Sequence, residues 1–164
     1  MNRLERLGAE LREEAARTRP HLEALEDADF AWRPHPRSFS AGELAAHLVE
    51  CLGWAEGVFA GDAFQFDPAT FVPFSAADRE TLLEGFDARL ARAEAARKRC
   101  DDLQALRTWR FHILDEVRFE RPREEALRDM TLNHLIHHRG QLTVYLRLLG
   151  RRVPCSYGPT ADDR

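Results

Sequence analysis

The sequence has few cysteines and no long apolar run, and both absences narrow the kind of protein it can be. Its three cysteines, Cys51, Cys100 and Cys155, are odd in number and widely spaced, which argues against a disulfide framework or a zinc ribbon. No stretch approaches the roughly 18 apolar residues of a membrane span. The charged start of the chain also lacks the apolar segment of a secretory signal. We therefore expect a cytoplasmic protein that makes no membrane contact.

Positive charge is not in excess either. The chain carries 24 Lys and Arg against 28 Asp and Glu, a net charge of −4, with no long block of one sign. Because a phosphate backbone is bound mainly by basic surface, nucleic acid is not an expected partner. A phosphate-cradling glycine loop, a dinucleotide fingerprint and a Ser-His-Asp set are also missing. With 164 residues, 44% of them apolar, the chain suffices for one domain over residues 1–164 with a sizeable core.

Apolar periodicity predicts the main elements of the fold. Residues recur at helical spacing in four stretches, 3–26, 41–59, 75–99 and 122–149. Ser40 and Glu43 have the spacing of a capping box, and Gly150 follows the last apolar residue, where helices often end. Pro20 is expected to bend or split the first helix, because it lacks the N–H of an interior residue.

The connections between the helices differ in character. Residues 61–68 read as an aromatic loop, whereas residues 109–120 alternate apolar and polar side chains. That alternation is typical of a strand, so it predicts an extended or hairpin-like excursion before the last helix. The fold class we predict is all-α, a four-helix bundle with this excursion, and such bundles build metal sites between facing helices.

Two histidines of the last predicted helix carry the strongest functional signal. His134 and His138 are four residues apart and therefore share one helix face, a geometry that can hold one metal ion. A third ligand has to come from elsewhere, and His47 is the polar residue on the apolar stripe of the second helix. A buried imidazole is costly unless its nitrogens are satisfied, which a shared divalent ion would do. A hydrogen-bonded core histidine is the alternative, and spacing alone leaves both open.

The other histidines carry weaker signals. His137 follows His134 by three residues but lies about 100° from His138 around the helix, which favours a surface or interface position. His112, in the alternating segment, is an ambiguous reserve ligand. His21 and His35 sit beside prolines and give no indication of a role.

No catalytic residue can be assigned from the pattern, but there are candidates. Glu50 lies three residues after His47 and could accept a hydrogen bond from it, act as a general base, or simply face solvent. Gln141 and Tyr145 follow His138 on its face of the helix and could orient it or point toward the site. Cys51 shares the face of His47 and could be a soft ligand or a reactive thiol, although a small buried apolar residue is favoured.

The last helix also bears on assembly. Gly140 in a helix interior costs about 1 kcal/mol relative to alanine, which predicts close approach of another helix or subunit. Arg139 beside it is expected to form a salt bridge, within the chain or across an interface. Apolar residues cover more of this helix than one buried face needs, which favours a homodimer: Leu132, Leu135, Ile136, Leu146 and Leu149.

Two motifs give the sequence a family resemblance. Residues 134–147 read H-x-x-H-H-R-G-Q-L-x-x-Y-L-R, and residues 157–162 read Y-G-P-T-A-D. Together they resemble the DinB family of damage-inducible proteins, part of the DinB/YfiT-like superfamily of metalloenzymes. The segment Ala45-Ala-His47-Leu is similar to the family's first ligand position. The likeness covers the whole chain, although residues 1–38 and 61–120 match only in layout.

The resemblance implies a four-helix bundle that forms homodimers and holds a divalent metal, zinc or nickel, through three histidines. Carried onto this chain, the metal ligands are His47, His134 and His138. Related branches of the superfamily are hydrolases or thiol-dependent transferases and isomerases that use bacillithiol or mycothiol. We therefore expect a metal-dependent hydrolase or thiol S-transferase acting on a small molecule, in the second case a low-molecular-weight thiol. The alternative is a non-catalytic, metal-stabilised dimeric stress-response protein. Three neutral histidines leave a coordination position open, as in catalytic zinc sites.

Overall fold

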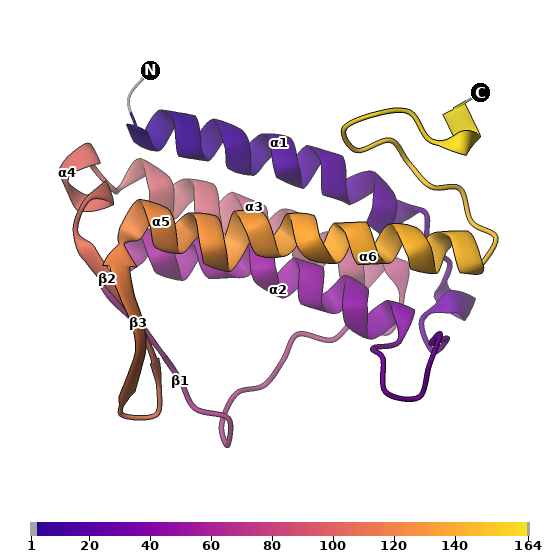
Figure 1. The fold of residues 1–164 in the computed structure, drawn as a ribbon, viewed down its shortest axis with the longest axis horizontal. Helices are drawn as coiled ribbons and strands as arrows, with labels where there is room; N and C mark the ends of the chain where they lie inside the picture. The colour runs from indigo at the N-terminus through magenta and orange to yellow at the C-terminus, as the bar shows by residue number, and fades with distance from the viewer. Residues whose placement is uncertain (1–2, 164) are drawn as a thin grey trace.

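The computed structural model describes residues 3–163 and shows four long helical segments lying side by side, with a small sheet at one end (Figure 1). The first three segments are α1 (Arg3–Glu23), α2 (Ala41–Ala60) and α3 (Arg79–Lys98). The fourth is a rod of three consecutive pieces, α5 (Arg123–Leu127), η2 (Arg128–Asn133) and α6 (His134–Leu148). Short helices complete the described chain: η1 (Asp27–Asp29), α4 (Asp102–Ala105) and η3 (Ala161–Asp163).

The predicted helix ends at residues 40 and 150 are confirmed. Ser40 Oγ accepts the Glu43 N–H at 3.1 Å, and Glu43 Oε2 accepts the Ser40 N–H at 2.6 Å, which is a complete capping box. At the other end Gly150 has φ +71°, a left-handed conformation that glycine adopts at no steric cost. The Arg151 N–H then reaches back to the Leu146 carbonyl at 2.8 Å, which closes the end of α6.

Two helix limits differ from the sequence prediction. Of the two outcomes expected at Pro20, a bend or a split, the split does not occur, since α1 continues to Glu23. Pro20 lies in the last turn of α1, where few residues follow and little of the helix depends on the missing N–H. The third helix begins at Arg79 rather than near Ser75, because Asp78 is its cap and accepts the Thr81 N–H at 2.8 Å.

A three-stranded sheet makes the predicted all-α class too narrow. Its strands are β1 (Ala63–Phe66), β2 (Thr108–Ile113) and β3 (Glu116–Pro122), in the order β1-β2-β3. β2 and β3 form the predicted hairpin, whereas β1, expected as part of a loop, pairs parallel to β2. Only four residues long, β1 is too short to give a periodic signal. Its long-range partner creates the strand.

The last helix is not the uninterrupted α-helix that the sequence predicts. The six residues of η2 form a π-helix between α5 and α6, directly before His134. A π-helix takes more residues per turn than an α-helix and often occurs at functional sites. It therefore sets the direction in which His134 and the residues after it face.

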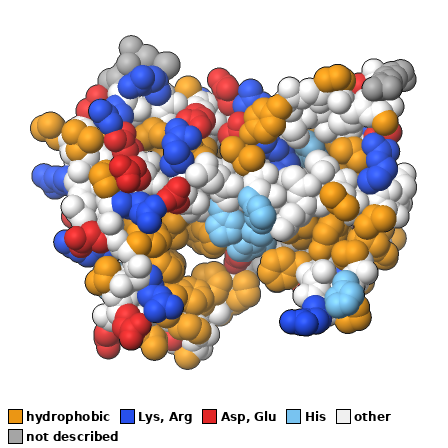
Figure 2. Space-filling model, in the orientation of Figure 1, with side chains coloured by type: hydrophobic (Ala, Val, Ile, Leu, Met, Phe, Trp, Pro, Cys, Tyr) orange, Lys and Arg blue, Asp and Glu red, His pale blue; other side chains and the backbone are white. Residues whose placement is uncertain are grey.

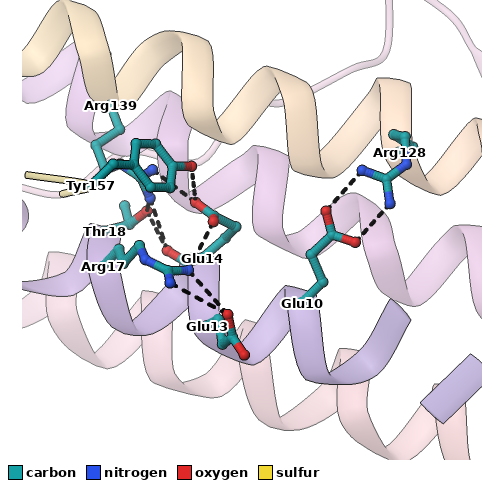
Figure 3. A network of polar contacts seen from close by, with 8 residues as sticks. All are labelled: Glu10, Glu13, Glu14, Arg17, Thr18, Arg128, Arg139 and Tyr157. Atoms are coloured by element: carbon teal, nitrogen blue, oxygen red, sulfur yellow. Dashed lines mark hydrogen bonds and ion pairs between the residues drawn. The ribbon is translucent and has the colours of Figure 1, made fainter. Parts of the chain in front are cut away.

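Arg139 ties α6 to α1 in the protein interior, as Figure 3 shows. Its Nη2 lies 2.7 Å from Glu14 Oε2, at an angle too bent for a straight hydrogen bond, and its Nη1 donates to Thr18 Oγ1 at 3.1 Å. Tyr157, from the C-terminal tail, donates its hydroxyl to Glu14 Oε2 at 2.7 Å. The predicted salt bridge of Arg139 is thus within the chain, and Tyr157 attaches the tail to α1.

Most of the apolar residues that favoured a homodimer are buried in the core of this chain. Leu132, Leu135 and Leu146 are completely buried, and Ile136 and Leu149 are half-buried. The excess of apolar surface that favoured a homodimer is therefore not present on these residues. Among residues 3–163, no helix has the length and apolar character to cross a membrane.

Candidate metal centre

Three imidazole rings from two helices lie together in the middle of one face of the molecule. His47 of α2 has its ring centroid 5.2 Å from that of His134 and 4.6 Å from that of His138, both on α6. The His134 and His138 rings are 4.7 Å apart, as their four-residue spacing predicts. Figure 2 shows histidine side chains gathered here beside a hollow with hydrophobic side chains around it.

Hydrogen bonds on the far side of two of these rings fix how they point. His47 Nδ1 lies 3.2 Å from Glu50 Oε2, and His138 Nδ1 lies 2.7 Å from Gln141 Oε1. Since both oxygens are acceptors, each Nδ1 carries the proton and each Nε2 keeps a free lone pair. His47 Nε2 faces His134 Nε2 at 3.3 Å, so these two ring nitrogens converge.

The surroundings keep the imidazoles of His134 and His138 neutral. Burial, followed by the neighbouring histidines, lowers the pKa of His134 to about 4. Burial also lowers the pKa of His138, only partly opposed by its hydrogen bond to Gln141. Neutral imidazole is the form that ligates a metal, so near pH 7 both rings are in the ligating state.

Cys51 lies next to this group, one helical turn after His47 and fully buried. Its sulfur and one nitrogen each of His47 and His134 lie within 4.8 Å of one another, a group that could hold a metal ion. Burial raises the pKa of the thiol, with a further contribution from the charge of Glu50. Without a metal the sulfur is therefore a protonated, weakly reactive group.

The three candidate catalytic residues have different positions. Glu50 uses both carboxylate oxygens, since Oε1 accepts the Phe74 N–H at 2.6 Å while Oε2 faces His47. Gln141 touches His138 through its oxygen and His137 through its nitrogen, the latter at 3.0 Å. Tyr145 is directed elsewhere, because its hydroxyl donates to the Phe39 carbonyl at 3.1 Å.

The remaining histidines lie outside the group. His137 is exposed, and its ring contacts Gln141 and the edge of His138 rather than His47. His112 lies in β2 opposite Gln65 of β1, in the sheet rather than among the imidazoles. His21, which carried no sequence signal, is completely buried, with Nδ1 2.9 Å from the Arg17 carbonyl.

Two hollows open beside His47 and Glu50. One, of about 320 Å³, is apolar and is bounded by α2, the sheet, η2 and the β1–α3 connection. The other, of about 430 Å³, lies toward the start of α2 and includes Phe39 and Phe74 in its walls. The rings of Phe39 and Trp54 also contact His47, at centroid distances of 5.8 and 5.6 Å. Room for a small molecule therefore adjoins the imidazole group on two sides.

Comparison with known proteins identifies the family. Residues 1–163 match the sequence profile of the DinB family. The chain belongs to the DinB family. It is 27% identical over 158 residues to the uncharacterized protein YrdA of Bacillus subtilis strain 168, a match that covers 92% of this chain and 85% of that protein.

Two solved structures of DinB-like proteins have the same fold. The protein YjoA of Bacillus subtilis superposes with a TM-score of 0.72 at 18% identity, covering 94% of this chain and 99% of that one. A DinB-like protein of Bacillus cereus ATCC 10987 superposes with a TM-score of 0.65 at 23% identity, covering 88% and 91%. The resemblance of residues 134–147 and 157–162 to the DinB family is thus confirmed.

Proposed function

We propose that this DinB protein is a metal-dependent enzyme whose divalent cation, zinc or nickel, is held by His47, His134 and His138. The observation that carries the proposal is the approach of His47 Nε2 and His134 Nε2 to 3.3 Å. A tetrahedral ion with Zn–N bonds of about 2.0–2.1 Å places its ligand atoms about 3.3–3.4 Å apart. A cation between the two nitrogens accounts for this approach, and so does a proton on one of them, which makes the contact an N–H···N hydrogen bond.

The hydrogen bonds behind the rings support the same assignment. Metal-ligating histidines almost always donate their second N–H to a carboxylate or carbonyl oxygen, which fixes the ring and raises its basicity. Glu50 does this for His47, and Gln141 does it for His138. We assign both as positioning residues. Each Glu50 oxygen already has a partner, which favours a positioning role over a general base.

A bound divalent cation would supply Lewis acidity, lowering the pKa of a coordinated water or stabilising a substrate thiolate. The protein contributes the orientation of three imidazoles and a low-dielectric surrounding made by the Phe39 and Trp54 rings. The two hollows beside His47 give a substrate access to the coordination positions that three histidines leave open. These features suit hydrolysis of a small ester or transfer of a small thiol.

Cys51 supplies the observation that favours a second candidate function. Its sulfur lies within 4.8 Å of a nitrogen of His47 and a nitrogen of His134, and His138 would have to be added to these three to give four ligands. A closed, four-ligand ion is typical of structural metal, which would make the protein a metal-stabilised stress-response protein without catalysis. We prefer the open site, because Gln141 already orients His138 in the way expected of a metal ligand.

An activity panel separates the two functions. Metal-loaded protein is assayed with aryl esters and with small thiols plus an electrophile, then treated with a chelator and reloaded with zinc or nickel. The enzyme hypothesis requires turnover that disappears on chelation and returns with metal. Loss of folding on chelation, with no turnover for any substrate, would favour the structural role. The homodimer that the resemblance implies stays a prediction, which light scattering at micromolar concentration tests.

A further inference from the structure

The apolar hollow beside His47 has a lining of unusual uniformity. Strand alternation places Phe64 and Phe66 of β1 on the same face of the sheet as Phe111 and Ile113 of β2. The Phe64 and Phe111 rings have parallel planes, and their centroids are 6.0 Å apart. This face closes one side of the hollow, and other elements close the rest: Trp54 of α2, Met130 of η2 and Phe71 of the β1–α3 connection.

Charge is almost absent from this lining. Of the residues around the hollow, only Glu50 carries a charge, and its two oxygens are occupied by His47 and the Phe74 N–H. Among residues 3–163, no lysine or arginine lines it. A phosphate, carboxylate or sulfonate placed there would lose its hydration with no partner in exchange, which is costly.

The hollow is also larger than a single ring requires. An apolar cavity of about 150 Å³ is enough to bind benzene, whereas this one measures about 320 Å³. A neighbouring hollow of about 240 Å³ shares Trp54, Phe64 and Met130 with it and extends the apolar surface to Trp109. The charged side chain in that extension, Glu56, is paired with Arg92 at 3.0 Å.

We propose that the substrate carries an uncharged aromatic or long alkyl group that fills this hollow, with its reacting atom at the His47 end. The proposal deepens the proposed function and rests on it. His47 joins the two parts, because it belongs to the imidazole group and also lines the hollow. The residues that select the substrate are then Phe66, Phe71, Phe111 and Ile113, none of which contacts the imidazoles.

The test uses a homologous series of alkanethiols from ethanethiol to octanethiol, benzyl mercaptan, and the charged 2-mercaptoethanesulfonate. Affinities are measured by calorimetry on the zinc-loaded protein and on the metal-free protein. Burial of one methylene contributes about 0.8 kcal/mol, so each added methylene is expected to tighten binding about fourfold until the hollow is full. Benzyl mercaptan is expected to bind at least tenfold more tightly than 2-mercaptoethanesulfonate.

Phe71→Asp places a charge in the hollow at an exposed position and should leave the core intact. Val72→Asp is the matched control, since Val72 is its neighbour in sequence, is exposed and does not line the hollow. The increase in affinity with the length of the alkanethiol is expected to weaken in Phe71→Asp and to persist in Val72→Asp. Phe111→Ala, which enlarges the hollow, is expected to lower affinity for benzyl mercaptan several-fold.

The two proposals fail in different ways. If zinc binds through the histidines but affinity is independent of chain length, or equal for the sulfonate, the apolar substrate is refuted and the metal site stands. If no metal binds but the metal-free protein shows the fourfold increments, the metal-dependent function fails and the apolar hollow is upheld.

Discussion

Two glutamates of α1 pair with arginines of the last helix, and together they test what burial does to an ion pair (Figure 3). Glu14 and Arg139 are buried, with 6% and 2% of their side chains exposed. Glu10 and Arg128 form a bidentate pair near the surface, with 36% and 46% exposed. The partners have the same chemistry, so a difference between the pairs reports on their surroundings.

Glu14→Ala is expected to cost about 3–5 kcal/mol of unfolding free energy, because it leaves the guanidinium of Arg139 buried without a countercharge. The acceptors that remain for Arg139 are Thr18 Oγ1 and the Glu14 backbone carbonyl, at 3.1 and 3.2 Å, and both are neutral. The substitution also removes the partner of the Tyr157 hydroxyl. Glu10→Ala is expected to cost less than about 1 kcal/mol, since an exposed pair is weakened by solvent.

Urea denaturation followed by circular dichroism measures both changes. For a domain of this size 1 kcal/mol shifts the melting temperature by about 2–4 °C, so Glu14→Ala is expected to melt about 6–20 °C lower. Equal effects of Glu14→Ala and Glu10→Ala, or a cost below about 1 kcal/mol for Glu14→Ala, would refute the view that Arg139 depends on this carboxylate.

Three further outcomes follow from the structure. Burial alone would raise the pKa of Asp29, but hydrogen bonds from Arg151 and the Glu26 N–H hold it below its usual value. The stabilisation of the fold by the Asp29 carboxylate is therefore present above about pH 4 and lost below it. Asp29→Asn should lower the free energy of unfolding by about 2 kcal/mol at pH 7. An equal loss at pH 2.5, measured by urea titration, would contradict this. Gly140→Ala should stabilise by about 0.5–1 kcal/mol, because apart from its chain neighbours and its own helix backbone no described atom lies within 4 Å of the added methyl. A loss of stability with loss of dimer mass in light scattering would instead place Gly140 in a subunit interface. The metal content of His137→Ala, measured by atomic emission, should equal that of the wild type. A metal-free His137→Ala protein would contradict the assignment of His134 and His138, rather than His137, to the metal-binding face of α6.

Local signals in the sequence were sufficient for some parts of the fold. The capping box of Ser40 and the left-handed Gly150 depend on residues within a few positions of each other, and both are found as predicted. The shared face of His134 and His138 likewise follows from helix geometry within one turn.

What could not be predicted depends on partners far away in the chain. β1 is a strand because Ala63–Phe66 pairs with residues 110–113, and nothing local requires it. Gly140 was expected to lie against another helix or subunit. Within residues 3–163 no other element comes within 4 Å of its open side, so contact with a subunit stays a prediction. The π-helix before His134 has no simple sequence signal, although it determines where the histidines face.

Glu50 shows how packing narrows a role that sequence leaves open. Its spacing from His47 allowed a general base, a hydrogen-bond acceptor or a solvated side chain. The β1–α3 connection brings the Phe74 N–H onto its second oxygen, 24 residues away in sequence. That contact occupies the carboxylate and favours orienting His47 over proton transfer.

The most direct test of the central claim is the metal content of four proteins purified without chelator: wild type, His134→Ala, His138→Ala and Cys51→Ala. Atomic emission gives the number of divalent ions per chain, and circular dichroism checks that each variant is folded. A three-histidine site predicts about one ion in wild type and in Cys51→Ala, and loss of most of it in His134→Ala and His138→Ala. Full metal content in His138→Ala, with loss in Cys51→Ala, would contradict the account and assign the ion to His47, Cys51 and His134.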